Sequence, residues 1–170
     1  CFKVGLYRQG LLHDLSKYSP TEFLVGCKYF QGNMSPNNAE REDKGYSAAW
    51  LHHKGRNKHH YEYWIDYSMQ ALPGGMAPVP MPDKYIAEMI MDRIAASKVY
   101  MGGEYTDRSP LDYYYQGTDR APIHPETKTK LLYVLEMLAE EGEEKTFRFI
   151  KEELVQHKRC MDWHQLEKAE

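Results

Sequence analysis

Hydrophobic residues recur along much of this 170-residue chain with the three- and four-residue spacing of helices. Residues 83–101 form one such run, with Pro82 near its start and two glycines after its end. A second run begins at Pro125, and after Gly142 an amphipathic run continues to about Cys160. These patterns predict helices through most of the second half of the chain.

Start signals for helices also occur in the first half of the chain. Residues 1–18 have a helical pattern of apolar positions interrupted by two glycines, so we expect two short helical pieces there. Ser19 then serves as an N-cap, a proline follows it, and Glu22 completes a capping box for a helix to about Gln31. Ser47 is the predicted cap of a further helix that begins with AAWLHH.

The segments between these helices lack a regular pattern. Residues 31–45 are polar and rich in asparagine and charge, which predicts a loop. Residues 71–82 hold four prolines and two glycines and are expected to form a long crossover. The tyrosine-rich residues 104–124 have no sustained period, and no stretch alternates like a β-strand. The predicted fold is therefore all-α, a single helical domain over residues 1–170 with long Pro/Gly-rich and Tyr-rich loops.

The composition restricts the classes of function. With 42% hydrophobic residues, 28% charged residues and a net charge of -3, the chain has the balance of a soluble protein and no basic field for extended nucleic acid. No apolar run is long enough to cross a membrane. Cys1, Cys27 and Cys160 are isolated, which predicts free thiols and a cytoplasmic location. A chain that begins at Cys1 rather than at methionine leaves room for a preceding segment.

The first candidate for chemistry is the adjacent pair His13 and Asp14, which follows two leucines. At least one of these polar side chains is expected next to the core, where an unpaired charge is costly. A divalent cation would compensate it, because imidazole nitrogen and carboxylate oxygen are ligands of first-row metals. The alternative is that the two residues pair with each other or cap the helix end.

The second candidate is Asp92. In a helix over residues 83–101, positions 85, 89, 92, 96 and 99 share one stripe that reads Tyr, Met, Asp, Ala and Val. An aspartate among apolar neighbours needs a partner, and a metal ion or a salt bridge to a basic residue elsewhere would each supply one.

The third candidate is the histidine-rich stretch HHKGRNKHHYEYW, residues 52–64. If one helix ran from Ser47 to about Met69, one face would carry Trp50, His53, Asn57, His60, Trp64 and Tyr67. That face suits a metal or ligand site in which Asn57 orients the histidines, while His52 and His59 would lie closer to solvent. A helix break at Gly55 or Asn57 would remove the basis for choosing His60 over His59. The alternative is a cluster of surface histidines.

Three stretches together resemble a bacterial and phage protein family of unknown function, number 5662. They are LLHDLSKYSPTEF, AWLHHKGRNKHHYEYW and EMIMDRIAA, and the resemblance spans nearly the whole chain. It is specific, but it implies no activity.

A more distant resemblance, carried by LLHDLSK and Asp92, is to the HD-domain metal-dependent phosphohydrolases. It implies an HD-domain-like helical bundle in which a His-Asp pair binds metal, Lys17 faces the phosphate, and Asp92 from a later helix completes the site. HD enzymes usually also take a histidine from the helix before the pair, and no histidine precedes His13 here. That ligand either lies upstream of Cys1 or is replaced by the later histidine-rich stretch.

The leading hypothesis is a metal-dependent phosphohydrolase that acts on a phosphate ester or nucleotide. One or two divalent transition-metal ions (Mn, Fe, Zn, Co or Ni) would activate water, held by His13, Asp14, His53, His60 and Asp92. Lys17 and Arg56 would hold the phosphate, and Glu62 or His59 would move protons. Two other hypotheses stay open: a non-catalytic metal- or nucleotide-binding module, and a structural protein whose histidines join aromatic core networks. The sequence does not predict an oligomeric state.

Overall fold

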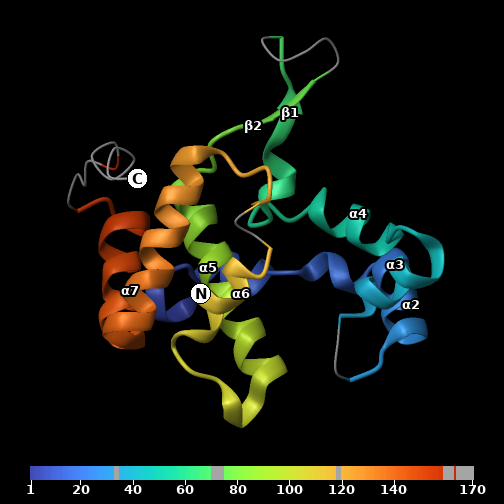
Figure 1. Ribbon diagram of the computed structural model, residues 1–170, viewed down its shortest axis with the longest axis horizontal. Helices are drawn as coiled ribbons and strands as arrows, with labels where there is room; N and C mark the ends of the chain where they lie inside the picture. The colour runs from blue at the N-terminus through green and yellow to red at the C-terminus, as the bar shows by residue number, and fades with distance from the viewer. Residues whose placement is uncertain (33–34, 70–74, 118–119, 159–162, 164–170) are drawn as a thin grey trace.

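The computed structural model describes residues 1–32, 35–69, 75–117, 120–158 and 163, which are mostly helical (Figure 1). The α-helices are α1 (Tyr7–Leu12), α2 (Pro20–Tyr29), α3 (Pro36–Lys44), α4 (Ala48–Lys54), α5 (Asp83–Met101), α6 (Ser109–Tyr115) and α7 (Pro125–Phe149). Short 3-10 turns are η1 (Phe2–Val4), η2 (Leu15–Tyr18), η3 (Tyr61–Trp64) and η4 (Gly102–Glu104), and a π-helical turn, η6 (Ile150–Val155), follows α7. Strands β1 (Ile65–Tyr67) and β2 (Met76–Pro78) form an antiparallel pair.

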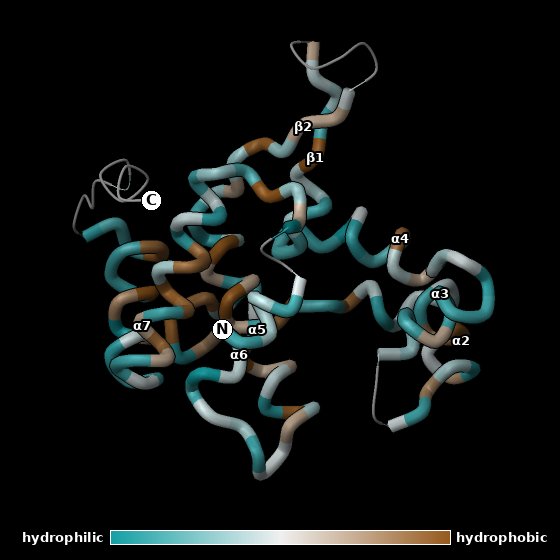
Figure 2. The backbone as a smooth tube through the Cα atoms, in the orientation of Figure 1, coloured by the Kyte–Doolittle hydropathy of each residue, from teal (hydrophilic) through white to brown (hydrophobic). Residues whose placement is uncertain are grey.

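The hydrophobic core lies among α5, α6, α7 and η6, on one side of the molecule (Figures 1 and 2). Its fully buried side chains include Ile86 and Ile90 of α5, Leu131, Leu135 and Leu138 of α7, and Ile150 and Leu154 of η6. Burial of each such side chain stabilises the fold by about 1.5–3 kcal/mol. This bundle is therefore the rigid scaffold that holds the polar face of α5.

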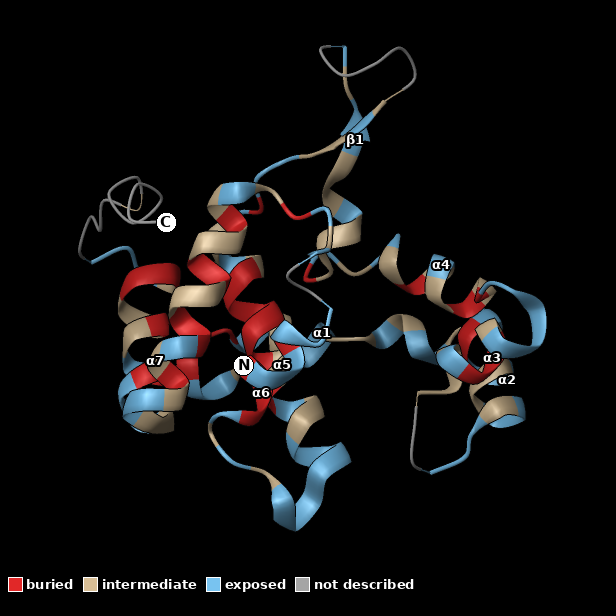
Figure 3. Cartoon of the chain, viewed as in Figure 1, coloured by how far each residue is buried: buried red, intermediate tan, exposed pale blue. Residues whose placement is uncertain are grey.

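Helices α2, α3 and α4 pack on one another on the other side of the molecule (Figures 1 and 3). Glu40 of α3 is fully buried between them. Its carboxylate accepts hydrogen bonds from the Ser47 hydroxyl at 2.7 Å and the Ala49 amide at 3.3 Å, and pairs with Lys44 at 3.0 Å. The helical unit α2–α4 is thus joined internally by a buried polar contact as well as by apolar packing.

Several helix boundaries confirm the predictions from the sequence. The Ser19 hydroxyl accepts a hydrogen bond from the Glu22 amide at 3.4 Å, and the Ser47 hydroxyl accepts one from the Trp50 amide at 3.0 Å. Helix α5 begins after Pro82 and ends at Gly102. Gly142, with φ 81°, interrupts α7 where the sequence predicted a break.

Other expectations are wrong. Much of the polar segment predicted as a loop forms α3, which Pro36 starts and Gly45, with φ 78°, ends. The prediction missed it because Glu40 is stabilised by partners from another helix. Residues 109–115 of the tyrosine-rich segment form α6, since Tyr114 is buried in the core. The all-α expectation also missed the β1–β2 ribbon.

Two smaller points complete the description. Cys1 and Cys27 are free thiols, while Cys160 lies outside the described residues. Within the described part of the chain, no helix combines the length and the apolar character that a membrane crossing requires.

Candidate metal centre

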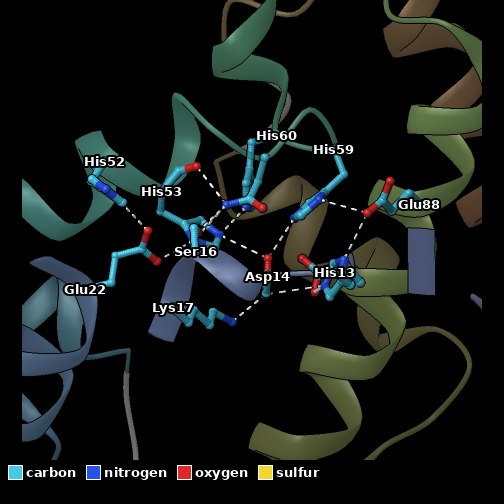
Figure 4. Close-up of polar contacts among 12 residues, drawn as sticks. His13, Asp14, Ser16, Lys17, Glu22, His52, His53, His59, His60 and Glu88 are labelled. Atoms are coloured by element: carbon cyan, nitrogen blue, oxygen red, sulfur yellow. Dashed lines mark hydrogen bonds and ion pairs between the residues drawn. The ribbon is translucent and has the colours of Figure 1, made fainter. Parts of the chain in front are cut away.

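The polar residues of three chain segments meet between the α5–α7 bundle and the α2–α4 unit (Figure 4). His13 and Asp14 lie between α1 and η2, the histidines lie in α4 and the turn after it, and Glu88 and Asp92 lie on α5. One imidazole nitrogen or carboxylate oxygen from each member of three overlapping groups lies within 4.8 Å of the others. We call two of these groups the buried half (Asp14, His53, His59 and His60) and the outer half (His13, Asp14 and Asp92), and the third, which consists of His13, His59 and Glu88, connects them.

The buried half brings imidazole Nε2 atoms close to one carboxylate oxygen. Asp14 Oδ1 lies 3.3 Å from His53 Nε2 and 3.4 Å from His59 Nε2. His53 Nε2 lies 2.9 Å from His60 Nε2. Three imidazoles and one carboxylate are a typical donor set for a tetrahedral Zn²⁺ or a similar ion.

The outer half is built around His13. Its Nε2 atom lies 3.2 Å from Asp92 Oδ1 and 3.4 Å from Asp14 Oδ2. Asp14 therefore offers one oxygen to each half, as a carboxylate that bridges two metal ions does. Asp14 has φ 57°, a left-handed conformation that Asp tolerates better than most residues.

The backbone after α4 explains how both His59 and His60 reach the centre. Helix α4 ends at Lys54, with Gly55 as its C-cap, so the single helix from Ser47 to Met69 is wrong. The amides of Arg56 and Asn57 both donate to the carbonyl of His53 at 3.0 Å, which turns the chain back toward α5.

This turn changes which side chains face the centre. His59, expected near solvent, is only 2% exposed. The Trp50 ring lies 5.6 Å from the His53 ring and 4.7 Å from the His60 ring. Trp64, expected on the same wall, packs on Tyr85 of α5 instead.

Carboxylates on the far side of the rings orient the histidines. Glu22 lies 2.8 Å from His53 Nδ1 and 2.6 Å from His52 Nδ1, so His52 is not the outward-facing residue that the helix prediction implied. Glu88 Oε1 lies 3.2 Å from His59 Nδ1 and 3.1 Å from His13 Nδ1. With Nδ1–H donating to a carboxylate, the Nε2 lone pair of the ring is directed into the centre, the arrangement seen around metal-bound histidines.

Neutral groups add to this support. The Asn57 amide donates to the His53 carbonyl at 2.9 Å and to the Ser16 hydroxyl at 2.7 Å, and that hydroxyl lies 3.2 Å from His53 Nδ1. Asn57 therefore lies beside His53, as the sequence predicted, although a turn rather than a helix brings it there.

Two atoms of the buried half have unsatisfied bonding capacity. Among the described residues, Asp14 Oδ1 and His59 Nε2 are buried and make no hydrogen bond, although they lie 3.4 Å from each other and Asp14 Oδ1 lies 3.3 Å from His53 Nε2. They face each other and two more imidazole nitrogens, so one divalent ion would satisfy them together.

The electrostatics of the centre favour a cation. Burial, followed by the neighbouring rings of His59 and His53, lowers the pKa of His60 to about 3, so this imidazole is neutral. Burial opposes the positive charge of His13, but hydrogen bonds to Asp92 and Glu88 outweigh it and raise its pKa to about 10. Burial likewise disfavours the Asp92 carboxylate, yet the contact with His13 holds its pKa below the usual value. Protons on the histidines thus balance carboxylate charge that a bound metal would balance instead.

A family model supports the assignment of this chain to a known group. The model described as Family of unknown function (DUF5662) matches residues 1–137, well over half of the chain. The chain belongs to this family. The matched range includes both halves of the metal centre. No curated protein and no solved structure matched the chain.

In this DUF5662 protein, five residues proposed as ligands from the sequence lie together: His13, Asp14, His53, His60 and Asp92. His59, proposed to move protons, lies among them with the geometry of a ligand. Lys17 lies at the edge, where its ammonium group is 2.6 Å from Asp14 Oδ2.

Two other proposed residues do not join the centre. Arg56 is exposed and donates to the His52 carbonyl at 3.2 Å. Glu62 belongs to none of the groups that could hold a metal ion among the described residues. Its charge acts instead on the neighbouring Tyr61, whose pKa is raised to about 12 by burial and then by Glu62. The reasoning that placed His13 beside apolar core leucines was also wrong, because Leu11 and Leu12 are 70% and 51% exposed.

The sequence reasoning missed the supporting carboxylates. Glu88 precedes Asp92 by four residues, so helical spacing alone places both on one face of α5. Glu22 was identified only as part of a capping box, and its contact with His53 joins residues 31 positions apart. No local pattern indicates that second contact.

Proposed function

We propose that this DUF5662 protein is a metal-dependent phosphohydrolase of HD-like type, with a helical site that binds one or two divalent transition-metal ions. The observation that supports this most is the position of Asp14, between His53 and His59 on one side and His13 on the other. A His-Asp pair that meets a later aspartate, Asp92, is also the arrangement expected of an HD-like site. The substrate would be a phosphate ester or a nucleotide.

In this proposal a bound ion supplies an activated water at neutral pH and polarises the phosphate. The chain's own residues have three tasks. The carboxylates of Glu22 and Glu88 orient imidazole rings. Lys17, which is 62% exposed and paired with Asp14, can turn to a phosphate oxygen as a point charge. Arg56, the other residue proposed to hold the phosphate, is exposed and donates to the His52 carbonyl instead.

A second candidate is a non-catalytic metal-binding module. The buried half supports it, because four protein donors occupy all the coordination positions of a tetrahedral ion and leave none for a substrate. Under either function the protein is expected in the cytoplasm, where free thiols persist.

The test begins with protein purified without a histidine tag and reconstituted with Mn, Fe, Zn, Co or Ni. We expect stoichiometric metal by plasma emission spectroscopy, and loss of at least one bound ion in His13→Ala and Asp92→Ala. His157→Ala is the matched control, because that side chain is 64% exposed and lies near Asp83, away from the centre. A screen of phosphomonoesters, phosphodiesters and nucleotides then separates the enzyme from the module. Equal metal content in all three variants would contradict the site.

A further inference from the structure

The two halves of the metal centre differ in donor type and donor number. The buried half offers three imidazole nitrogens and one carboxylate oxygen, whereas the outer half offers one imidazole nitrogen and two carboxylate oxygens. Nitrogen-rich sets favour Zn²⁺, Co²⁺ and similar ions, and oxygen-rich sets accept harder ions such as Mn²⁺ and Mg²⁺. The halves should therefore prefer different metals.

They also differ in exposure to solvent. The side chains of His53 and His59 are 5% and 2% exposed, while those of His13 and Asp92 are 22% and 31% exposed. Structural zinc sites are usually closed by four protein ligands, and catalytic sites keep a position open with three. By donor count and by exposure, the buried half has the features of a closed site and the outer half those of an open one.

We propose that the two halves bind different ions for different purposes. The buried half holds one Zn²⁺-type ion permanently and joins the α2–α4 unit to the rest of the protein. The outer half binds a harder, exchangeable ion such as Mn²⁺ and is where a phosphate group meets the metal. This inference rests on the proposed function, because it requires that the centre bind metal.

The contacts around each half agree with this division. In the buried half, Glu22 holds His53 and Glu88 holds His59 through Nδ1, so the directions of two donors are fixed before an ion binds. In the outer half, the Lys17 ammonium already occupies Asp14 Oδ2 at 2.6 Å. An ion there must displace this exposed ammonium group from Asp14, which weakens the binding of the ion.

The test uses the full chain, stripped of metal with a chelator and refilled in two steps. One equivalent of Co²⁺ is added first, and its visible absorption reports the coordination geometry. Mn²⁺ is added next, and the loss of the free Mn²⁺ electron paramagnetic resonance signal reports its binding. We expect the intense absorption of four-coordinate Co²⁺, followed by binding of one Mn²⁺ that does not change the cobalt spectrum.

Two variants separate the halves. Asp92→Asn should weaken Mn²⁺ binding by at least about tenfold and leave the cobalt spectrum unchanged, while His59→Gln should abolish the four-coordinate cobalt spectrum. Asp43→Asn is the control for Asp92→Asn, since Asp43 is an exposed carboxylate on α3 that pairs with Lys28. Circular dichroism checks that each variant is folded.

The outcomes distinguish the two proposals. If the wild-type protein binds neither ion, the proposed function fails and this inference fails with it. If it binds metal but Asp92→Asn alters the cobalt spectrum as much as His59→Gln does, the division into two halves is wrong and the metal site stands. Displacement of Co²⁺ by Mn²⁺ would overturn the division in the same way.

Discussion

Glu88 supports one histidine of each half of the metal centre, so its substitution tests the whole arrangement. Its Oε1 atom lies 3.1 Å from His13 Nδ1 and 3.2 Å from His59 Nδ1, and its Oε2 atom accepts from the Gln9 amide at 2.8 Å. Contacts with these groups outweigh burial and hold the Glu88 pKa well below its usual value, so both imidazoles contact a carboxylate anion. Glu88→Gln keeps the shape of the side chain and removes the charge.

The expected loss can be estimated from these contacts. A carboxylate behind a metal-bound histidine usually contributes about 10–100-fold to metal affinity, or about 1.4–2.7 kcal/mol. Because Glu88 contacts His13 and His59, both ions should weaken by this amount. Glu88→Ala is less useful, since it leaves both imidazole N–H groups without this acceptor, and the loss at the buried His59 alone would cost about 1–3 kcal/mol, a large part of a typical stability of about 5–15 kcal/mol.

Competition with a chromophoric chelator measures each affinity, using Co²⁺ for the buried half and Mn²⁺ for the outer half. Glu22→Gln is the matched comparison: its carboxylate contacts His53 but no ligand of the outer half, so only cobalt affinity should fall. The reasoning is refuted if Glu88→Gln binds both ions as tightly as the wild-type protein. It is also refuted if Glu22→Gln weakens Mn²⁺ as much as Co²⁺.

Three further predictions concern charge and capping. Lys17→Met removes the cation paired with Asp14, so Mn²⁺ affinity measured by paramagnetic resonance should rise severalfold while inorganic phosphate binds the loaded protein more weakly; an unchanged Mn²⁺ affinity would contradict the competition. In chelator-treated protein, contacts with Asp92 and Glu88 outweigh burial and raise the His13 pKa from 6.5 to about 10. The stability that these contacts give to the fold is therefore fully present below about pH 6.5 and is lost as the pH rises toward 10. Burial lowers the His60 pKa from 6.5 to about 3, so the neutral imidazole leaves the fold most stable above about pH 6.5, and stability falls as the pH drops toward 3. Urea unfolding should therefore show maximal stability near pH 6.5, and a flat profile would contradict both pKa shifts. Ser47→Ala removes both an N-cap and a donor to buried Glu40, so urea unfolding should show a loss of about 1–3 kcal/mol, and a loss below about 0.5 kcal/mol would show that neither contact matters.

The sequence predicted local features better than it predicted the path of the chain. The caps at Ser19 and Ser47 were predictable because each involves residues three positions apart. Asp92 was identified because helical spacing placed it among apolar residues, and the structure brings it to His13, 79 positions away. The sequence left two paths open for the histidine-rich stretch, one helix or a break at Gly55 or Asn57, and the structure has the break at Gly55.

The missed features share a physical cause. Helix α3 has a polar sequence because its stabilising contact is the buried Glu40 carboxylate, whose partners Ser47 and Ala49 belong to the start of α4. Glu22 is also a polar residue whose partner lies on another helix, since it supports the centre through its contact with His53 of α4. A single sequence carries no periodic signal for a polar residue whose partner is distant in the chain.

The positions of these partners also explain why the metal centre lies where it does. The apolar core fixes α5 and therefore Asp92, while Glu22 and the capped start of α4 fix His53. These two parts of the protein share little apolar packing, so the polar residues between them must define how they meet. Asp14 lies between the two sides, since one of its carboxylate oxygens is 3.3 Å from His53 of α4 and the other is 3.4 Å from His13, which contacts Asp92 of α5. A metal ion at this junction would strengthen the joint where the hydrophobic core does not extend, which gives the buried half a structural purpose independent of catalysis.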